Sequence, residues 1–269
     1  MARQGMVVGP TPNTNLGQHW LNDTSVLEDI VAEARLNAGD TVLEVGPGPG
    51  ALTRVLLDAH MKVIAVEFDE RLAKHLIEHT QNDNLTVVQQ DILTFNLTAL
   101  PPDYSVVANI PYYLTSKLVR LLCESTNPPK RAVLLVQKEV AQRIAAAPGD
   151  MSVLSVSAQV YNTVRLGRVV RPELFTPPPK VDSQVVILER RPQPYVPKEQ
   201  LQTFFQVVKA GFSERRKKLR SSLSGGLRIE KQQADQLLAQ TAIVSSARAQ
   251  ELSLDDWLKL TYTYQQSVQ

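Results

Sequence analysis

The sequence contains a single cysteine, Cys123, among its 269 residues. One cysteine cannot form an internal disulfide, so a small secreted fold held by disulfides is excluded. Apolar runs such as residues 132–136 are far shorter than the roughly 20 residues that cross a bilayer, which excludes a transmembrane enzyme. The 4 histidines show no metal-ligand spacing, so we expect no metal. Residues 1–15 lack the apolar segment of a signal peptide, and we expect a cytoplasmic protein without a membrane partner.

The charge of the chain is unevenly distributed, although the net charge is only +2. Residues 1–190 contain 17 Lys and Arg against 20 Asp and Glu, whereas residues 191–269 contain 12 against 7. Much of the C-terminal excess lies in one basic run, Arg215, Arg216, Lys217, Lys218 and Arg220. Taken alone, such a run is more typical of a solvated helix face than of a phosphate-binding surface.

Short apolar segments alternate with helical patterns in the N-terminal half. Strands are predicted at residues 41–45, 62–67, 85–89, 104–108 and 131–136. Helices are predicted at residues 24–36, 51–59, 69–79, 116–123 and 139–147. This alternation, with strands apolar on both faces, predicts a parallel sheet covered by helices. The β-branched residues between 153 and 190 predict antiparallel strands at one edge of that sheet.

Three prolines within residues 191–197 predict a domain boundary. Beyond it, short helices are predicted at residues 199–212, 215–223, 231–238, 247–251 and 254–262. We therefore expect an α/β domain over residues 1–192 and a small helical domain over residues 193–269.

A glycine-rich turn, EVGPGPG at residues 44–50, follows the first predicted strand. Strand, glycine turn and helix in this order are typical of a Rossmann-like unit. Dinucleotide-binding turns use the spacing GxGxxG and hold a pyrophosphate with backbone N–H groups. Here the spacing is GxGxG, and Pro47 and Pro49 have no N–H for a phosphate. The turn therefore favours S-adenosylmethionine over NAD.

Two acidic residues end the next two predicted strands. Glu67 can accept hydrogen bonds from both hydroxyls of a ribose, and Asp91 can accept one from the exocyclic amine of an adenine. Acids at these positions also cap helices, and for either residue alone the two interpretations are equally good. Together with the glycine turn, they favour cofactor binding.

The segment Asn109-Ile110-Pro111-Tyr112 follows the fourth predicted strand, at the sheet edge where open α/β folds bind ligands. An amino group on a planar base is a poor nucleophile because its lone pair is delocalised into the ring. The side-chain oxygen of Asn109 and the carbonyl of Pro111 can accept its two hydrogens and free that lone pair, while a flipped-out base stacks on Tyr112. Methyl transfer to this nitrogen then requires alignment. An Asn-Pro pair alone indicates only a turn, but the full pattern predicts a base methyltransferase.

Seven segments together resemble the ribosomal RNA adenine N6,N6-dimethyltransferase family. They are residues 16–23, 44–53, 89–91, 109–112, 137–140, 175–183 and 212–219. Their order and their spread over nearly the whole chain make the resemblance specific. It implies a Rossmann-like class I S-adenosylmethionine-dependent methyltransferase with a small C-terminal helical domain. The implied activity is dimethylation of two adjacent adenosines near the 3′ end of 16S rRNA, by a monomer acting on the immature small ribosomal subunit.

The resemblance also implies the residues of the site. The S-adenosylmethionine site is expected to contain His19, Leu21, Gly46, Glu67, Asp91 and Asn109. The target amine is expected to be held by Asn109, Pro111 and Tyr112, with Phe175 on the opposite face of the base, although the sequence alone favours Phe175 as a core residue. With an RNA substrate implied, the phosphates are expected to contact Arg215, Arg216, Lys217, Lys218 and Arg220.

Three positions depart from the usual family pattern, and two alternatives stay open. His19 and Trp20 stand where Asn and Phe are usual, and Tyr113 replaces a polar residue. A 23S rRNA adenine N6-methyltransferase of the macrolide-resistance type shares the NxPY pattern, but residues 175–183 and 212–219 favour the small-subunit enzyme. A non-catalytic assembly factor is expected to have a damaged cofactor site, whereas Gly46 and Glu67 are intact.

Overall fold

The computed structural model describes residues 10–214 and 216–268, which form two compact units. The first unit contains the described residues up to 142 and residues 163–190, and the second contains residues 143–162 and those from 191 on. The change of unit after residue 190 lies two residues from the predicted boundary at 192. Residues 143–162 were expected in the first domain, but they pack with the C-terminal helices.

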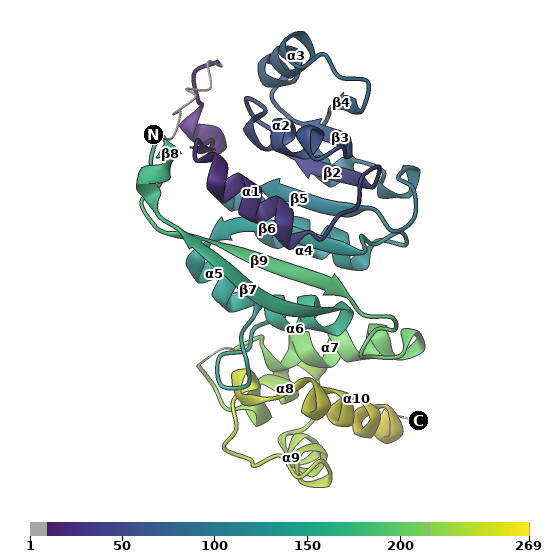
Figure 1. Cartoon of the computed structure of the whole chain (residues 1–269). Helices are drawn as coiled ribbons and strands as arrows, with labels where there is room; N and C mark the ends of the chain where they lie inside the picture. The colour runs from purple at the N-terminus through teal and green to yellow at the C-terminus, as the bar shows by residue number, and fades with distance from the viewer. Residues whose placement is uncertain (1–9, 215, 269) are drawn as a thin grey trace. The chain divides into compact units, whose positions relative to one another are not determined.

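The first unit is built on a seven-stranded sheet (Figure 1). Its order is β4 (Leu85–Gln89), β3 (Lys62–Glu67), β2 (Thr41–Val45), β5 (Ser105–Asn109), β6 (Arg131–Gln137), β9 (Ser183–Arg190) and β7 (Asn162–Val170). The first five strands pair in parallel, and β9 pairs antiparallel to β6. The predicted parallel sheet with antiparallel strands at one edge is therefore confirmed.

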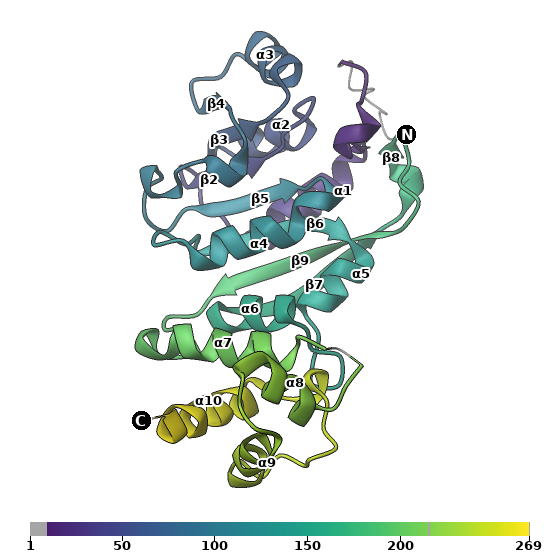
Figure 2. The same cartoon turned by 180° about the vertical axis from the view of Figure 1, so that it is seen from behind.

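Helices cover both faces of this sheet. They are α1 (Thr24–Glu33), α2 (Ala51–Asp58), α3 (Glu70–His79), α4 (Thr115–Glu124) and the start of α5 (Lys138–Ile144). Figures 1 and 2 show α1 on one face of the sheet and α4 on the other. The α1 helix begins where Asp23 accepts a hydrogen bond from the Val26 amide, and it buries Leu27 and Ile30 against the core. A small second sheet pairs β1 (Trp20–Leu21) with β8 (Phe175–Thr176).

Residues 153–161 were predicted to be strand, and the structure corrects this prediction, because they form α6 (Val153–Tyr161). Ser152 and Ser155 form a reciprocal capping box at its start. Val156 and Val160 are buried four residues apart, which is the spacing of one helix face. The cap and this spacing outweigh the strand preference of the β-branched residues.

The second unit packs α6 with four further helices around one core. They are α7 (Leu201–Gly211), α8 (Leu219–Leu227), α9 (Lys231–Gln240) and α10 (Leu254–Val268). Their core is centred on fully buried Trp257 and Phe204. A Cβ on Gly211 would lie 2.4 Å from the Trp257 ring, so only glycine permits this approach. The predicted helical C-terminal region is therefore confirmed.

Of the described residues of the basic run, Arg216, Lys217 and Lys218 precede the helix that was predicted from residue 215, and only Arg220 lies within it. Helix α8 begins at Leu219, and Lys218 before it has an extended backbone (φ −63°, ψ 146°). Arg216, Lys217 and Lys218 lie in the exposed connection before α8, where their side chains are not restricted to one helical face. Arg215 lies outside the described residues.

Candidate active site

A cavity of about 330 Å³ lies in the first unit at the carboxyl ends of β2, β3 and β5, together with the residues after β4. Its other wall is formed by residues 16–21 of the N-terminal segment, which we define as residues 13–21. The volume lies within the range of roughly 300–1,000 Å³ that is usual for small-molecule sites. The position agrees with the expectation that open α/β sheets bind ligands at this edge.

The structure brings the predicted cofactor and amine-binding residues together on this cavity. Its lining includes His19, Leu21, Gly46, Glu67, Asp91, Asn109, Pro111 and Tyr112. These residues come from positions up to 93 residues apart in the chain, and the topology of the sheet places them side by side. The lining also includes Glu44, Gln18 and Trp20, for which the sequence predicted no role.

Phe175 is not part of the described cavity lining. Its side chain is 3% exposed and belongs to the core that contains Leu21 and Leu27. The pairing of β8 with β1 places Phe175 opposite Leu21 and holds it there. The expectation that Phe175 packs on the target base is therefore not supported by its position, and the core interpretation agrees with the structure.

The glycine turn allows a close approach between backbone and cavity wall. Gly48 has a φ of 55°, and a Cβ there would lie 3.4 Å from Nε1 of Trp20. A side chain at this position would therefore strain the backbone and crowd the indole ring. The turn keeps its amides occupied, because Gly46 N donates to the Val66 carbonyl and Gly50 N to the Pro47 carbonyl. These occupied amides agree with a ligand that has no phosphate at this turn.

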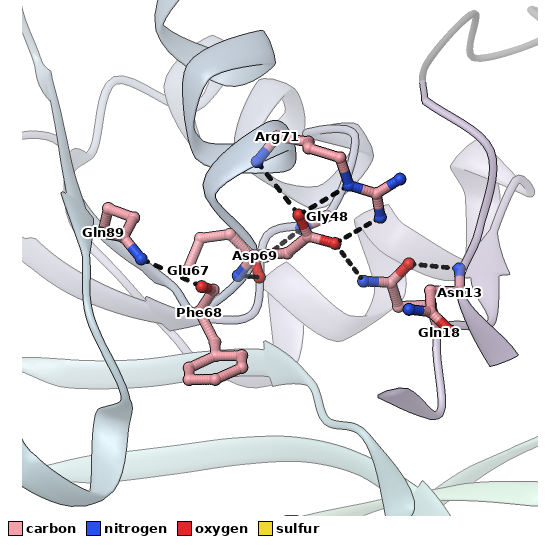
Figure 3. A network of polar contacts seen from close by, with 8 residues as sticks. All are labelled: Asn13, Gln18, Gly48, Glu67, Phe68, Asp69, Arg71 and Gln89. Atoms are coloured by element: carbon pink, nitrogen blue, oxygen red, sulfur yellow. Dashed lines mark hydrogen bonds and ion pairs between the residues drawn. The ribbon is translucent and has the colours of Figure 1, made fainter. Parts of the chain in front are cut away.

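Glu67 belongs to a polar network beside the cavity (Figure 3). Its Oε2 accepts a hydrogen bond of 3.2 Å from Gly48 N, and its Oε1 accepts one of 2.9 Å from Asp69 N. Burial raises the pKa of the Glu67 carboxyl, and the two amide hydrogen bonds oppose this rise. The amides fix the direction of the carboxylate, and each oxygen has a second lone pair for a ligand hydroxyl.

Both sequence interpretations of Asp91 agree with its surroundings. Its Oδ1 accepts a hydrogen bond of 2.9 Å from Leu93 N and so caps the short 3₁₀ helix Ile92–Thr94. The residue also lines the cavity. A carboxylate can serve both purposes because its two oxygens offer about four acceptor positions.

The amide of Asn109 has a fixed orientation. Its Nδ2 donates a hydrogen bond of 3.1 Å to the carbonyl of His19, which leaves Oδ1 as the acceptor of this side chain. His19 is itself held, because its Nδ1 donates to the Pro177 carbonyl at 2.7 Å. The carbonyl of Pro111 accepts from Leu114 N at 2.9 Å and retains one lone pair.

Tyr112 is held at both its ring and its hydroxyl group. Its hydroxyl shares a hydrogen bond of 2.8 Å with the Ser183 hydroxyl, and its ring stacks with the His19 imidazole at a centroid distance of 5.7 Å. Burial raises the pKa of the Tyr112 phenol, so the ring stays neutral. Two further aromatic side chains of the cavity lining are well exposed, Phe68 at 58% and Tyr113 at 62%.

Two buried polar atoms of cavity-lining residues have no hydrogen-bond partner among the described residues. They are Nε1 of Trp20 and Oε2 of Glu44. Buried polar groups are normally paired, and an unpaired donor and an unpaired acceptor beside one cavity indicate a ligand with both kinds of group. The amino-acid end of S-adenosylmethionine has an acceptor carboxylate and a donor ammonium, so these residues fit that cofactor.

Glu44 is expected to make stability depend on pH. Its side chain is 1% exposed, and burial raises the pKa of its carboxyl to about 8. At pH 8 the unfolded chain has released this proton while much of the folded chain retains it, so stability falls as pH rises from 4.5 to about 8. We expect Glu44→Gln to raise the free energy of unfolding at pH 8 by roughly a few kcal/mol and to change it little at pH 4.5. Urea unfolding at both pH values tests this, and equal stability of both proteins at pH 8 would contradict it.

No group of three His, Cys, Asp or Glu within residues 10–214 and 216–268 is arranged to hold a metal ion. In the same residues, no helix is long and apolar enough to cross a membrane.

The sequence matches a family described as ribosomal RNA adenine dimethylase over residues 10–266. A ribosomal RNA small subunit methyltransferase A from a Synechocystis strain is 39% identical, with 93% of this chain and 95% of the relative covered. The protein of the same name from Dehalococcoides mccartyi is 40% identical, with 93% of this chain and 87% of the relative covered.

Two solved structures are similar over almost the whole chain. The 23S rRNA methyltransferase ErmE is 31% identical with a TM-score of 0.73, covering 91% of this chain and 98% of ErmE. A dimethyladenosine transferase from Plasmodium falciparum is 26% identical with a TM-score of 0.77, covering 92% of this chain and 98% of the transferase.

Proposed function

The chain belongs to the ribosomal RNA adenine dimethylase family, and from this premise we propose that it dimethylates two adjacent adenosines near the 3′ end of 16S rRNA. The observation that best supports this activity is that one cavity is shared by two groups of residues. One group is the NxPY segment with its oriented Asn109, and the other is the glycine turn with Glu67 and Asp91. A methyl acceptor and a nucleoside cofactor can therefore meet there.

When bound, S-adenosylmethionine would supply a methyl group attached to a positively charged sulfur. A nucleophile can take over this methyl group without activation by a metal. Asn109 Oδ1 accepts one hydrogen of the target amine, because the His19 carbonyl holds the Nδ2 side of the amide. The Pro111 carbonyl accepts the other hydrogen with its remaining lone pair. Tyr112 offers its fixed ring to the flipped-out base. These contacts draw the nitrogen lone pair out of conjugation and align it for in-line displacement.

The cofactor is proposed to lie between the N-terminal segment and the strand ends. Glu67 accepts hydrogen bonds from the ribose hydroxyls and Asp91 accepts one from the adenine amine. Gly46, Leu21 and His19 form the walls around the remainder. The roles of these residues stay predictions, and their common position on the cavity supports them.

The basic run is proposed to bind RNA phosphates. Its described residues differ in whether their charge is already paired with an acidic side chain. Lys217 forms an ion pair of 2.6 Å with Glu214, and Arg220 forms one of 3.0 Å with Asp235. Arg216 and Lys218 are exposed and form no ion pair with a described residue. Arg216 and Lys218 are therefore expected to contribute most of the phosphate binding.

Replacing Arg216 and Lys218 by Gln is expected to weaken rRNA binding and to flatten its salt dependence. Each lost phosphate contact lowers the slope of log K against log salt by about 0.7–0.9. Filter binding of 16S rRNA fragments over a range of salt concentrations measures this slope, and the affinity for S-adenosylmethionine is expected to stay the same. An unchanged slope would remove these residues from the RNA contact.

The proposed reaction is tested with small subunits from cells that lack the modification. Purified protein and S-adenosylmethionine are incubated with these particles or with large-subunit particles, and primer extension maps the modified adenosines. Two adjacent dimethyladenosines near the 3′ end of 16S rRNA are expected. Modification of 23S rRNA alone would favour the macrolide-resistance type of enzyme. Action as a monomer in the cytoplasm on an immature small subunit stays a prediction.

A further inference from the structure

The N-terminal segment is tied to the rest of the cavity wall at several separate points. The His19 carbonyl accepts the hydrogen bond that orients Asn109, and Trp20 lies beside Gly48. Only a segment held in place can present the His19 carbonyl to Asn109, because the hydrogen bond is lost if the segment moves away. What holds the segment against the start of α3 is therefore relevant to the chemistry of the site.

Gln18 connects this segment to the network around Glu67 (Figure 3). Its Nε2 donates a hydrogen bond of 3.2 Å to Asp69 Oδ2, and its Oε1 accepts one of 2.6 Å from Asn13 N. Both ends of the side-chain amide are thus used, and the amide has one orientation. The amide of Asp69 donates to Glu67, so Gln18 lies two hydrogen bonds from the carboxylate proposed to bind the ribose.

The Asp69 carboxylate is well suited to receive this hydrogen bond. It caps α3 by accepting from Arg71 N at 3.0 Å, and it forms an ion pair of 2.7 Å with the Arg71 guanidinium. The Arg71 hydrogen bond, with the Gln18 hydrogen bond adding to it, holds the pKa of Asp69 below its ordinary value. The acceptor for Gln18 is therefore an ionised group fixed to the start of a helix.

We propose that Gln18 and Asp69 are positioning residues that form a latch, through which the N-terminal segment stays docked over the cofactor and keeps Asn109 oriented. This inference rests on the proposed function and extends it to two residues outside the predicted site. Loss of the latch lets the segment detach, so that the cofactor dissociates more readily and Asn109 loses the carbonyl that orients it.

Gln18→Ala is expected to weaken binding of S-adenosylhomocysteine about tenfold, the effect of one hydrogen bond to a charged group. It is also expected to lower kcat, because both ground-state binding and amine alignment depend on the segment. Isothermal titration calorimetry and single-turnover methylation of 16S rRNA measure these two effects. Asn96→Ala is the matched control, since Asn96 caps a 3₁₀ helix in the same unit and lies outside the cavity lining.

A donor–acceptor swap separates the latch from a general structural effect. In Gln18→Glu, two carboxylates face each other at the present 3.2 Å contact, and the affinity is expected to fall about tenfold or more. In Asp69→Asn the Gln18 amide faces a second amide, while the new side chain still caps α3. The double variant combines both changes, so that an amide at position 69 donates to a carboxylate at position 18. Its affinity is expected to exceed that of Gln18→Glu without reaching that of wild type, because Asp69→Asn also removes the ion pair between Asp69 Oδ2 and Arg71.

The outcomes distinguish the latch from the proposed function. If the wild-type protein does not bind S-adenosylhomocysteine, the proposed function fails. If the wild type binds and the double variant is as weak as Gln18→Glu, or if Gln18→Ala binds as tightly as wild type, the latch alone is refuted. Thermal unfolding without ligand is expected to stay within about 2 °C of wild type for Gln18→Ala. If Gln18→Ala lowers Tm so far that partial unfolding explains the weaker binding, a positioning role is likewise refuted.

Discussion

Asn109→Ala is expected to lower kcat for adenosine methylation by about 10²- to 10³-fold. The variant removes the Oδ1 acceptor whose direction is set by the Nδ2 hydrogen bond to the His19 carbonyl. Without this acceptor the amine keeps its planar geometry, and its lone pair stays delocalised in the ring. The chemical step is then slowed much more than binding of the rRNA.

Single-turnover transfer of labelled methyl groups to unmodified small subunits measures this step directly. The free energy of unfolding is expected to fall by about 1 kcal/mol, the contribution of the lost hydrogen bond to the His19 carbonyl, while the backbone pairing of Asn109 with β6 stays intact. The affinity for 16S rRNA serves as the control and is expected to be unchanged. Turnover near the wild-type rate would eliminate Asn109 as the group that holds the amine.

Glu67→Gln is expected to weaken S-adenosylmethionine binding by about 10- to 100-fold. The carboxylate accepts from two amides, Gly48 N and Asp69 N, with one oxygen for each. A carboxamide has one oxygen only, so its NH₂ group must face one of these N–H groups. The variant therefore loses an acceptor for the ribose and also disturbs the glycine turn.

The raised pKa of Glu67 adds a pH dependence with a definite sign. Since burial raises this pKa above 4.5, protonation on acidification begins at a higher pH than for an exposed glutamate. The wild-type affinity for S-adenosylmethionine is expected to fall as pH decreases towards that pKa, and the affinity of Glu67→Gln is expected to lack this contribution. Calorimetry from mildly acidic to neutral pH measures both curves, and parallel curves would contradict the role of Glu67.

The strands and helices that are defined by local patterns were predictable from the sequence. The β2, β3 and β4 strands have the predicted bounds, because each is a short apolar segment between turn residues. Residues 153–161 were mispredicted, because a buried helix face and a strand can share the same β-branched composition. The start of α8 was also displaced from the prediction, since the basic residues gave no apolar spacing to locate it.

The comparisons confirm the predicted family, fold class, methyltransferase activity and cofactor class. The roles of the individual site residues stay predictions. No spacing rule could have identified Gln18, because its partner Asp69 is 51 residues away in the chain. Glu44 is visible in the sequence as the first residue of the EVGPGPG segment. The rise of its pKa, however, follows from its burial, which only the structure shows.

By itself, the sequence determined which chemical groups this protein has and in which order, including the glycine turn, the two strand-end acids and the NxPY segment. These features depend on residues close together in the chain, where short-range periodicity and turn chemistry decide the structure. Only the tertiary structure decided which of those groups share a cavity and that the His19 carbonyl orients Asn109. The contact between His19 and Asn109 joins residues 90 positions apart, and such contacts form only when the packing of the sheet brings distant segments together.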